Sequence, residues 1–557
     1  MENYLIKANK WKNSSVLPQK LKDELNKMDE SQLKEAFYTD LEFGTGGMRG
    51  IMGPGTNRIN EIIIRKATLG FARFLLQEEK NIKEKGVVIA HDNRLNHDEF
   101  TKAAADVFTT LGIKVYIFDS LRPTPELSFA IRYLKAGGGI NLTASHNSKE
   151  YNGYKIYNSQ GNQLILAQSN IVLKEIESIE DELAIEVKPN DNLLITLDEK
   201  VDEAFYQMVI DTSINKDMPK NNVKIVYSPQ HGTGYVPATT VLRRLGYKVI
   251  EVKEQCFPSP TFENTLSPNP ENKDAYVLAI EYAKKEKADM ILTNDPDCDR
   301  VGLVVMENNE PIYLTGNQTG ALLINYILSN KKYNNGMIFN TIVSSFLGNK
   351  VAESYGVQVK QTLTGFKYIG DEIHHLLLEK KNEFVMGYEE SYGYLFNSNV
   401  RDKDGVQADV MISEMVSYYK HQGKNVLEVL DELYKKFDYY VDTQYSYFAK
   451  GIEGVQIINN LMEKLRKENL NNILEYKVVV QEDYLKLEKN DHGKISHLNF
   501  EKSNVLRFIL EDGSFIAIRP SGTEPKCKFY FSIHDKNIAL AQEKHDRIKE
   551  FFLSFIN

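Results

Sequence analysis

Strand patterns alternate with helix patterns through most of this chain, and the alternation limits the folds open to it. KATLGFARFLLQEEK has the apolar spacing of a helix, GVVIA is typical of a buried strand, DEFTKAAADVFTTLG of a helix and IKVYIF of a strand. The same order returns from VKIVYSP to YKVIEV, and from AYVLAIEYAKKEK into ADMILTN. Because strands joined through helices form parallel sheets with helices on their faces, the sequence predicts several α/β units.

The last part of the chain is patterned differently. KVVVQEDYLKL, NVLRFILEDGSFIAIRP and KCKFYFSI are strand-rich, and a helix pattern follows near LAQEKHDRIKEFFLSF. A chain of 557 residues exceeds what one core supports. We therefore expect α/β domains at 1–205, 206–312 and 313–445, and a smaller α+β domain at 446–557.

Composition excludes some classes of partner. The 68 basic residues nearly balance the 77 acidic ones, with no long run of one sign, so no nucleic-acid surface is expected. No apolar stretch is long enough to span a membrane, and the amino terminus lacks a signal core. The three cysteines show no CxxC spacing, which favours a reducing compartment. We expect a cytoplasmic protein with no membrane partner.

The segment GGGINLTASHNSKEYNGYKIY contains a polar turn around Ser145, after glycines that precede a strand. His146 offers a proton acceptor and Lys155 a cation within the same loop, as a reactive or phosphate-carrying serine requires. A plain turn residue is the alternative. No GxSxG motif is present, which argues against acyl-enzyme hydrolysis.

Three aspartates, Asp295, Asp297 and Asp299, alternate directly after the strand ADMILTN. Carboxylates at this spacing repel one another unless a hard cation lies among them, so the motif indicates Mg²⁺ or Ca²⁺. An EF-hand is excluded because Arg300 and Met306 replace its glycine and its closing glutamate. Since Mg²⁺ commonly completes its shell with phosphate oxygens, we expect a phosphate nearby.

Two further segments suit a phosphosugar. FIAIRPSGTEPKCKFY offers a phosphate cradle of guanidinium, hydroxyl and backbone groups, with Lys526 or Lys528 as further cations. Its candidate residues are Arg519, Ser521, Gly522 and Thr523. EFVMGYEESYGYLF places Glu389, Glu390 and Ser391 where they could accept sugar hydroxyls. An ordinary glycine turn and a solvated acidic loop are the respective alternatives.

Nucleotide-binding motifs are absent from the sequence. In QHGTGYVP, Pro237 replaces the third glycine of a dinucleotide-binding fingerprint, and no GK[ST] completes a Walker A loop. Neither a nicotinamide enzyme nor a nucleotide hydrolase is supported.

Taken together, these segments resemble the α-D-phosphohexomutase family, and within it the branch of phosphoglucomutases and phosphopentomutases. The resemblance runs in order through EFGTGGMRG, HDNRLNHDEF, TASHNSKEYNGYK, NDPDCDR, TGFKYIG, GYEESYGY, RDKDG and RPSGTEP. It implies a four-domain architecture around a central cleft, with three related α/β domains and a smaller C-terminal α+β domain.

The resemblance also implies residue roles. Ser145 would carry the phosphate and join the three aspartates around Mg²⁺, so that the metal set is Ser145, Asp295, Asp297 and Asp299. The implied catalytic residues are Ser145, His146, Lys403, Arg49 and Lys155, with Lys403 and His146 handling protons. The implied substrate-binding residues are Arg300, Thr364, Gly365, Glu389, Ser391, Arg519, Ser521, Gly522 and Thr523.

The implied reaction interconverts α-D-glucose 1-phosphate and glucose 6-phosphate, through a phosphoserine enzyme and glucose 1,6-bisphosphate. The alternatives are a phosphopentomutase, a phosphomannomutase, a glucose 1,6-bisphosphate synthase and a scaffold without activity. The expected partner is a phosphosugar, and the expected state a monomer or weak dimer. The chain departs from the family at Ser148, where most members carry proline, and at Lys528, where a further arginine is expected.

Overall fold

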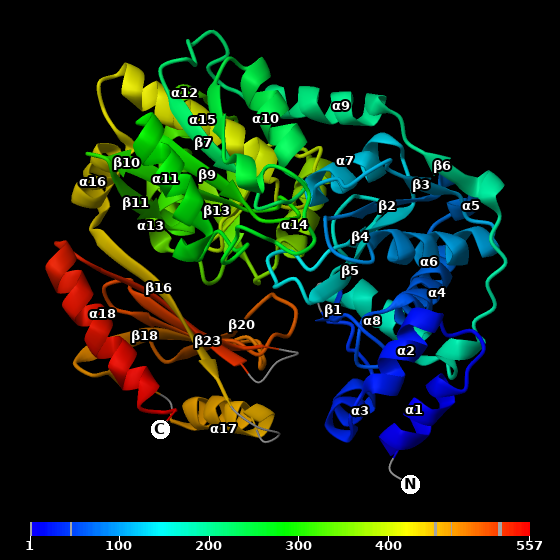
Figure 1. Cartoon of the computed structure of the whole chain (residues 1–557). Coiled ribbons are helices and arrows are strands. Elements are labelled where there is room, and N and C mark those ends of the chain that lie inside the picture. The colour runs from blue at the N-terminus through cyan, green and yellow to red at the C-terminus, as the bar shows by residue number, and fades with distance from the viewer. Residues whose placement is uncertain (1–2, 45–46, 450–453, 469, 522–525, 557) are drawn as a thin grey trace. The chain divides into compact units, whose positions relative to one another are not determined.

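The computed structural model describes residues 3–44, 47–449, 454–468, 470–521 and 526–556 (Figure 1). The chain forms two compact units. The first comprises Met1–Leu314 with Phe366–Tyr418, and the second comprises Thr315–Gly365 with Tyr419–Asn557.

The first unit begins with short helices and a six-stranded sheet. The sheet order is β1-β5-β4-β2-β3-β6. The strands are β1 (Met48–Ile51), β2 (Val87–His91), β3 (Val115–Ile117), β4 (Gly138–Leu142), β5 (Tyr151–Asn158) and β6 (Leu194–Thr196). The helices are α1 (Asn3–Lys12), α2 (Gln19–Lys27), α3 (Glu30–Phe37), α4 (Glu61–Glu78), α5 (Ile82–Lys85), α6 (His97–Thr110), α7 (Thr124–Tyr133), α8 (Leu166–Glu177) and α9 (Glu199–Ile210).

A five-stranded sheet follows in the same unit, in the order β11-β10-β9-β7-β8. Its strands are β7 (Lys224–Ser228), β8 (Lys248–Glu251), β9 (Met290–Asn294), β10 (Val301–Glu307) and β11 (Glu310–Leu314). Its helices are α10 (Tyr235–Arg244) and α11 (Val277–Glu286). Strand β7 pairs in parallel with β8 and β9, and β10 turns back antiparallel to β9.

Later segments contribute to both units. In the first unit, β14 (Glu383–Glu389) pairs antiparallel with β15 (Gly393–Leu395). In the second, β12 (Gly336–Thr341) pairs in parallel with β13 (Gln358–Thr362). The helices of this part of the chain are α12 (Gly316–Asn330), α13 (Phe346–Ser354), α14 (Phe366–Glu379), α15 (Gly405–His421) and α16 (Val426–Phe437).

The C-terminal part of the second unit is an eight-stranded sheet with the order β16-β23-β22-β21-β18-β19-β20, in which β17 pairs with β18. Its strands are β16 (Tyr439–Phe448), β17 (Asn472–Ile473), β18 (Tyr476–Asp483), β19 (Glu488–Asp491), β20 (Lys494–His497), β21 (Leu506–Leu510), β22 (Phe515–Pro520) and β23 (Lys526–Asp535). Helices α17 (Gly454–Lys467) and α18 (Ile538–Leu553) pack on it around an apolar core that includes Phe508, Phe529 and Phe552.

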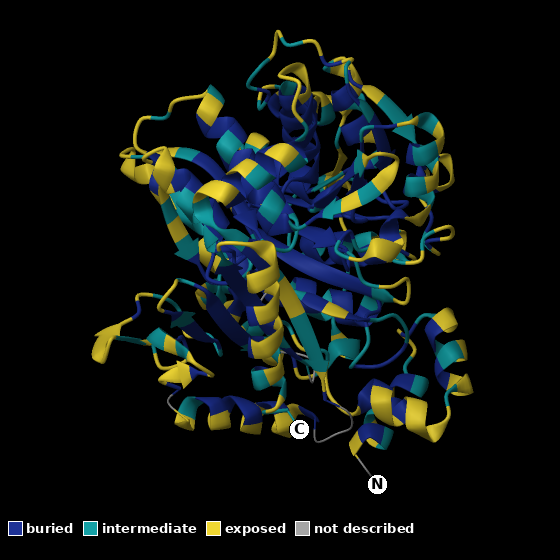
Figure 2. Cartoon of the chain, turned by 90° about the vertical axis from the view of Figure 1, so that its left-hand side faces the viewer, coloured by how far each residue is buried: buried dark blue, intermediate teal, exposed yellow. Residues whose placement is uncertain are grey.

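Burial follows the expected layering. In Figure 2 most strand residues are buried, whereas the helices carry exposed residues on one side. Strands β2, β4 and β9 are buried along their whole length, as strands covered on both faces should be. None of the described helices is long and apolar enough to cross a membrane.

The predicted alternation of strands and helices is confirmed, as is the strand-rich end with its closing helix. Two details differ. Gly138 and Gly139 lie inside β4 rather than before it. Glycine is needed at both positions because a Cβ there would lie closer than 3 Å to a backbone oxygen of a neighbouring strand. Helices α1 to α3 were not predicted, because each has only eight to ten residues and is therefore shorter than the window over which helical periodicity is usually recognised.

A buried carboxylate begins helix α15. Asp404 accepts hydrogen bonds from the backbone N–H and the side-chain amide of Gln407, at 2.9 and 2.8 Å, and so caps the helix. Burial raises the pKa of Asp404 to about 7, whereas an unfolded chain gives about 3.9. The native state therefore holds this proton more tightly. The contribution of this proton to the free energy of unfolding is fully present below about pH 4 and is lost as the pH rises through about 7.

Replacing Asp404 with Asn keeps a capping side chain that cannot ionise. We expect the free energy of unfolding of D404N, relative to the wild type, to increase as the pH rises from about 5 to about 7, by at most about 1.4 kcal/mol per pH unit. Urea unfolding at several pH values measures the difference. A difference that does not change with pH, or that shrinks as the pH rises, would contradict the shifted pKa.

Candidate active site

Ser145 lies in the loop between β4 and β5, with its backbone in the left-handed region at a φ of 52°. Its backbone N–H donates to Thr143 Oγ1 at 2.8 Å, and its hydroxyl donates to Asp295 Oδ2 at 2.8 Å. His146 Nδ1 lies 3.3 Å from Ser145 Oγ. The serine predicted to carry phosphate therefore contacts both a predicted metal ligand and a predicted proton acceptor.

The three aspartates occupy the turn between β9 and β10. All are buried, and one ligand oxygen from each lies within 4.8 Å of the others. The turn is closed by a hydrogen bond from the Cys298 N–H to the Asp295 carbonyl, with Cys298 at a φ of 53°. Thr124, at the start of α7, anchors it by donating its N–H to the Asp297 carbonyl and its hydroxyl to Asp297 Oδ2.

This donor set fits a hard divalent cation. Asp297 Oδ1 and Asp299 Oδ1 are buried, and neither has a hydrogen-bond partner among the described residues. Buried carboxylate oxygens ordinarily have partners. Converging oxygens of this kind are the ligands that Mg²⁺ and Ca²⁺ prefer. The structure thus provides room in the ligand sphere for the metal that the sequence predicts.

Two lysines partly compensate the charge of the aspartates. Lys155 Nζ lies 2.7 Å from Asp297 Oδ2 and 3.4 Å from Asp299 Oδ2. Lys403 Nζ lies 3.1 Å from Asp299 Oδ2 and 3.3 Å from Asp402 Oδ1. The expectation that Lys155 shares the serine loop was wrong. Lys155 lies within β5, which runs antiparallel to β4, and it pairs with Asn141 near the end of β4 that leads into the serine loop.

Burial and neighbouring charges shift the pKa values of Asp295 and Asp299 in opposite directions. Burial, together with the charges of Asp299 and Asp297, raises the pKa of Asp295 well above its usual value. For Asp299 burial also acts upward, but Lys403 and Lys155 outweigh it and hold the pKa below its usual value. Without a cation, one carboxylate of the group therefore remains hard to ionise. A bound cation would remove that penalty.

Two arginines and a glutamate border the aspartates. The Arg300 N–H donates to Asp295 Oδ1 at 3.0 Å, while its guanidinium pairs with Glu271. Arg49, from β1, donates to Asn147 Oδ1 at 3.3 Å and lies within electrostatic range of the aspartates. Glu389 is the last residue of β14 and is buried, and its charge acts on both Arg300 and Lys403.

Ser391 lies in the turn that follows β14. The remaining predicted sugar and phosphate ligands belong to the second unit. Thr364 and Gly365 follow strand β13, with Gly365 at a φ of 110° that favours glycine. Arg519 lies near the end of β22, and Ser521 N–H donates to the Lys526 carbonyl at 2.7 Å. Gly522 and Thr523 lie outside the described residues. The roles of all these residues stay predictions.

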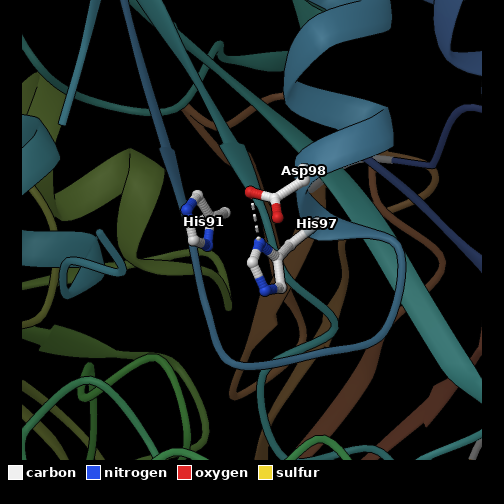
Figure 3. Close-up of side chains that lie close together, drawn as sticks. All are labelled: His91, His97 and Asp98. Carbon is white, nitrogen blue, oxygen red and sulfur yellow. Dashed lines mark ion pairs between the residues drawn. The ribbon is translucent and has the colours of Figure 1, made fainter. Parts of the chain in front are cut away.

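A second group of metal-type side chains, His91, His97 and Asp98, lies at the end of β2 and the start of α6 (Figure 3). Its geometry does not suit one ion. The two imidazoles stack at a centroid distance of 4.3 Å and an interplanar angle of 9°. The lone pair of each imidazole nitrogen lies in the plane of its own ring, and here the two planes are nearly parallel and stacked. One ion therefore cannot lie about 2 Å from a nitrogen of each ring and along both lone pairs. Asp98 is exposed and pairs with His97 Nδ1 at 3.2 Å. We do not assign a metal to this group.

Some site residues were missed from the sequence. Thr124 holds Asp297, Glu271 pairs with Arg300, and Asp402 holds Lys403 while it accepts hydrogen bonds from Tyr157 and Gln163. Asp402 lies in RDKDG, where its place beside the lysine was a usable signal. Thr124 and Glu271 reach the site only through tertiary contacts, which the sequence does not signal.

Comparison with known proteins agrees with this geometry. The family models of the four phosphoglucomutase/phosphomannomutase domains match successive segments of this chain. They are alpha/beta/alpha domain I at residues 40–183, domain II at 203–308, domain III at 315–437 and the C-terminal domain at 462–547. The predicted architecture of three α/β domains and a C-terminal domain is thus confirmed.

Relatives with the name phosphoglucomutase cover most of the chain. One from Staphylococcus haemolyticus is 38% identical over 90% of this chain and 92% of its own length. One from Staphylococcus epidermidis is 36% identical over 97% of this chain and 99% of its own length. Among solved structures, a putative phosphomannomutase from Thermus thermophilus is 22% identical, covers 91% of this chain and 98% of its own, and superposes with a TM-score of 0.68. The chain therefore belongs to the phosphoglucomutase/phosphomannomutase family.

Proposed function

We propose that this chain is a phosphoglucomutase, which interconverts α-D-glucose 1-phosphate and glucose 6-phosphate with Ser145 as the phosphate carrier. The observation that carries the proposal is the 2.8 Å hydrogen bond from Ser145 Oγ to Asp295 within a buried triad of aspartates. A group transferred to or from this oxygen lies beside the charges that phosphoryl transfer requires.

Asp295, Asp297 and Asp299 would hold a Mg²⁺ ion, with Ser145 supplying a further oxygen ligand. When bound, Mg²⁺ supplies the positive charge that stabilises the transferring phosphoryl group. Mg²⁺ is preferred to Ca²⁺ because a site of few protein carboxylates leaves coordination positions for phosphate oxygens.

The cations around the triad have separate roles. Arg300 and Arg49 contact the phosphate while it moves between Ser145 and the sugar oxygen. Lys155 is held by Asp297 and keeps that carboxylate ionised. Lys403 lies 3.1 Å from Asp299 and, with His146 beside Ser145 Oγ, moves the proton of the attacking hydroxyl.

Sugar and second-phosphate recognition complete the proposal. By the resemblance, the residues that bind the sugar hydroxyls are Glu389, Ser391, Thr364 and Gly365. The phosphate that is not reacting is gripped by Arg519, Ser521, Gly522 and Thr523. Glucose 1,6-bisphosphate forms in the site and reverses its orientation, so one binding loop serves both directions of the reaction.

The glucose preference rests on the relatives from two Staphylococcus species, whose name is phosphoglucomutase and which align over most of the chain. The GYEESYGY loop supports it, because its paired glutamates can accept neighbouring hydroxyls of one sugar face.

The activity is tested with glucose 1-phosphate, Mg²⁺ and a catalytic amount of glucose 1,6-bisphosphate, with glucose 6-phosphate measured by a coupled dehydrogenase. We expect turnover by the wild type and a loss of more than about 10³-fold in Ser145→Ala, which lacks the carrier oxygen. Ser148→Ala, a hydroxyl deletion in the same loop, is the matched control and should keep the activity.

The same reaction conditions, with a readout specific for the product of each substrate, separate the alternatives. Equal or greater kcat/KM on mannose 1-phosphate or ribose 1-phosphate would replace the glucose assignment with a phosphomannomutase or a phosphopentomutase. Bisphosphate formed from glucose 1-phosphate and a separate phosphate donor, without net mutase turnover, would identify a bisphosphate synthase. Equal activity in the wild type and Ser145→Ala would reject Ser145 as the carrier.

Removal of one aspartate should weaken metal binding before any substrate is present. We expect Mg²⁺ to raise the Tm of the chelator-treated wild type, because the ion relieves the repulsion among buried carboxylates of the native state alone. Asp297→Asn should show little or no rise at the same Mg²⁺ concentration. Asp289→Asn removes a carboxylate that instead accepts the Lys224 backbone N–H, and it should keep the full rise. Equal rises in Asp297→Asn and the wild type would place the ion elsewhere.

A further inference from the structure

Arg94 is a buried cation beneath the loop that carries Ser145. Its side chain is fully inaccessible to solvent. A guanidinium has five N–H donors, and in this structure all of them are used. Nε donates to Asp92 Oδ2 at 3.1 Å, and the other four N–H groups donate to backbone carbonyls.

The four carbonyls belong to one short stretch of chain. Nη2 donates to the carbonyls of Ser145 and Asn147, each at 2.7 Å. Nη1 donates to those of Ser148 and Tyr151, each at 2.8 Å. Arg94 is therefore bonded to the backbone on both sides of the carrier serine, and through Tyr151 to the start of β5.

The same cation is tied to the amino side of Ser145. Asp92 pairs with Arg94 and accepts the Thr143 hydroxyl at 2.6 Å. Thr143 Oγ1 in turn accepts the Ser145 backbone N–H at 2.8 Å. Both the N–H and the C=O of Ser145 are thus fixed by one hydrogen-bonded frame of Asp92, Thr143 and Arg94.

The conformation held by this frame is one that a serine does not adopt readily. Ser145 has a φ of 52°, in the left-handed region that disfavours side chains with a Cβ. The segment from Thr143 to Tyr151 contains no proline, so its own sequence adds little stiffness. Tertiary hydrogen bonds must therefore supply the rigidity.

We propose that Arg94 is a positioning residue for catalysis, which holds the Ser145 backbone so that Oγ faces Asp295 and the metal ligands. The role rests on the function proposed above, because it concerns the placement of the phosphate carrier. Arg94 makes no contact with the substrate and takes no proton. It acts through the loop carbonyls, and a small displacement of Oγ from the in-line geometry is enough to slow phosphoryl transfer.

The test is Arg94→Lys, which keeps the buried charge opposite Asp92 but has three donors in place of a five-donor fork. At most two of the four carbonyls can then be bonded beside Asp92. We expect kcat to fall by about 10²-fold with little change in the KM for glucose 1-phosphate, because the loss lies in carrier alignment rather than in substrate binding. Single-turnover transfer of phosphate from glucose 1,6-bisphosphate to Ser145 should slow by the same factor.

A matched control separates positioning from general stability. Arg466 is also largely buried and donates to Asp483 and Asn504 in the C-terminal part of the second unit. Arg466→Lys should lower the Tm and leave kcat per folded enzyme unchanged. If Arg94→Lys likewise lowers only the Tm, the side chain is merely structural and the proposal is wrong.

A second variant covers the case in which Arg94→Lys does not fold. Thr143→Val keeps the shape of the buried side chain but removes the hydroxyl that links Asp92 to the Ser145 N–H. We expect kcat to fall about tenfold with KM retained, the loss of one uncharged hydrogen bond at the carrier. Unchanged kcat in Thr143→Val would overturn the proposed frame. A wild type without mutase activity on any phosphosugar would instead overturn the proposed function, and this inference with it.

Discussion

Three buried aspartates, each with a ligand oxygen within 4.8 Å of the others, determine which charged and polar groups the first unit must place around them. Such a group is strongly unfavourable unless positive charge is brought to it. Lys155 and Lys403 arrive from β5 and from the segment before α15, and they contact Asp297 and Asp299. Two buried aspartate oxygens have no hydrogen-bond partner among the described residues, as expected of oxygens that coordinate a divalent cation.

The supporting structure extends beyond the charged groups themselves. Thr124 fixes Asp297 from α7, and the Gly405 N–H donates to the Cys298 carbonyl at the tip of the aspartate turn. A Cβ on Gly405 would lie 2.7 Å from that carbonyl oxygen, so only glycine allows this approach. The serine loop is held in a comparable way by buried polar contacts rather than by its own sequence. Both reactive loops of the first unit are thus preorganised by partners distant in the chain.

The sequence predicted the fold class because strand and helix periodicities are local properties. It also predicted the aspartate motif, whose spacing places three carboxylates in one turn wherever the turn lies. It did not predict that Lys155 belongs to β5. A lysine close to a polar turn resembles a loop residue as long as the residues that its side chain contacts are unknown. Nor did the sequence assign roles to Glu271, Thr124 or Arg94. Their functions depend on contacts formed only after folding. Arg94 stands in the segment HDNRLNHDEF, but that segment does not indicate which backbone carbonyls the guanidinium would bond.

The central claim is that Ser145 itself carries the phosphate, and mapping of the phosphorylated residue tests it most directly. The protein is treated with glucose 1,6-bisphosphate and Mg²⁺, quenched, digested and examined by mass spectrometry for phosphopeptides. The account predicts a single phosphate, on Ser145, that is discharged when excess glucose 1-phosphate is added. Phosphate on another residue, or an unmodified Ser145 in protein that is turning over, would contradict it.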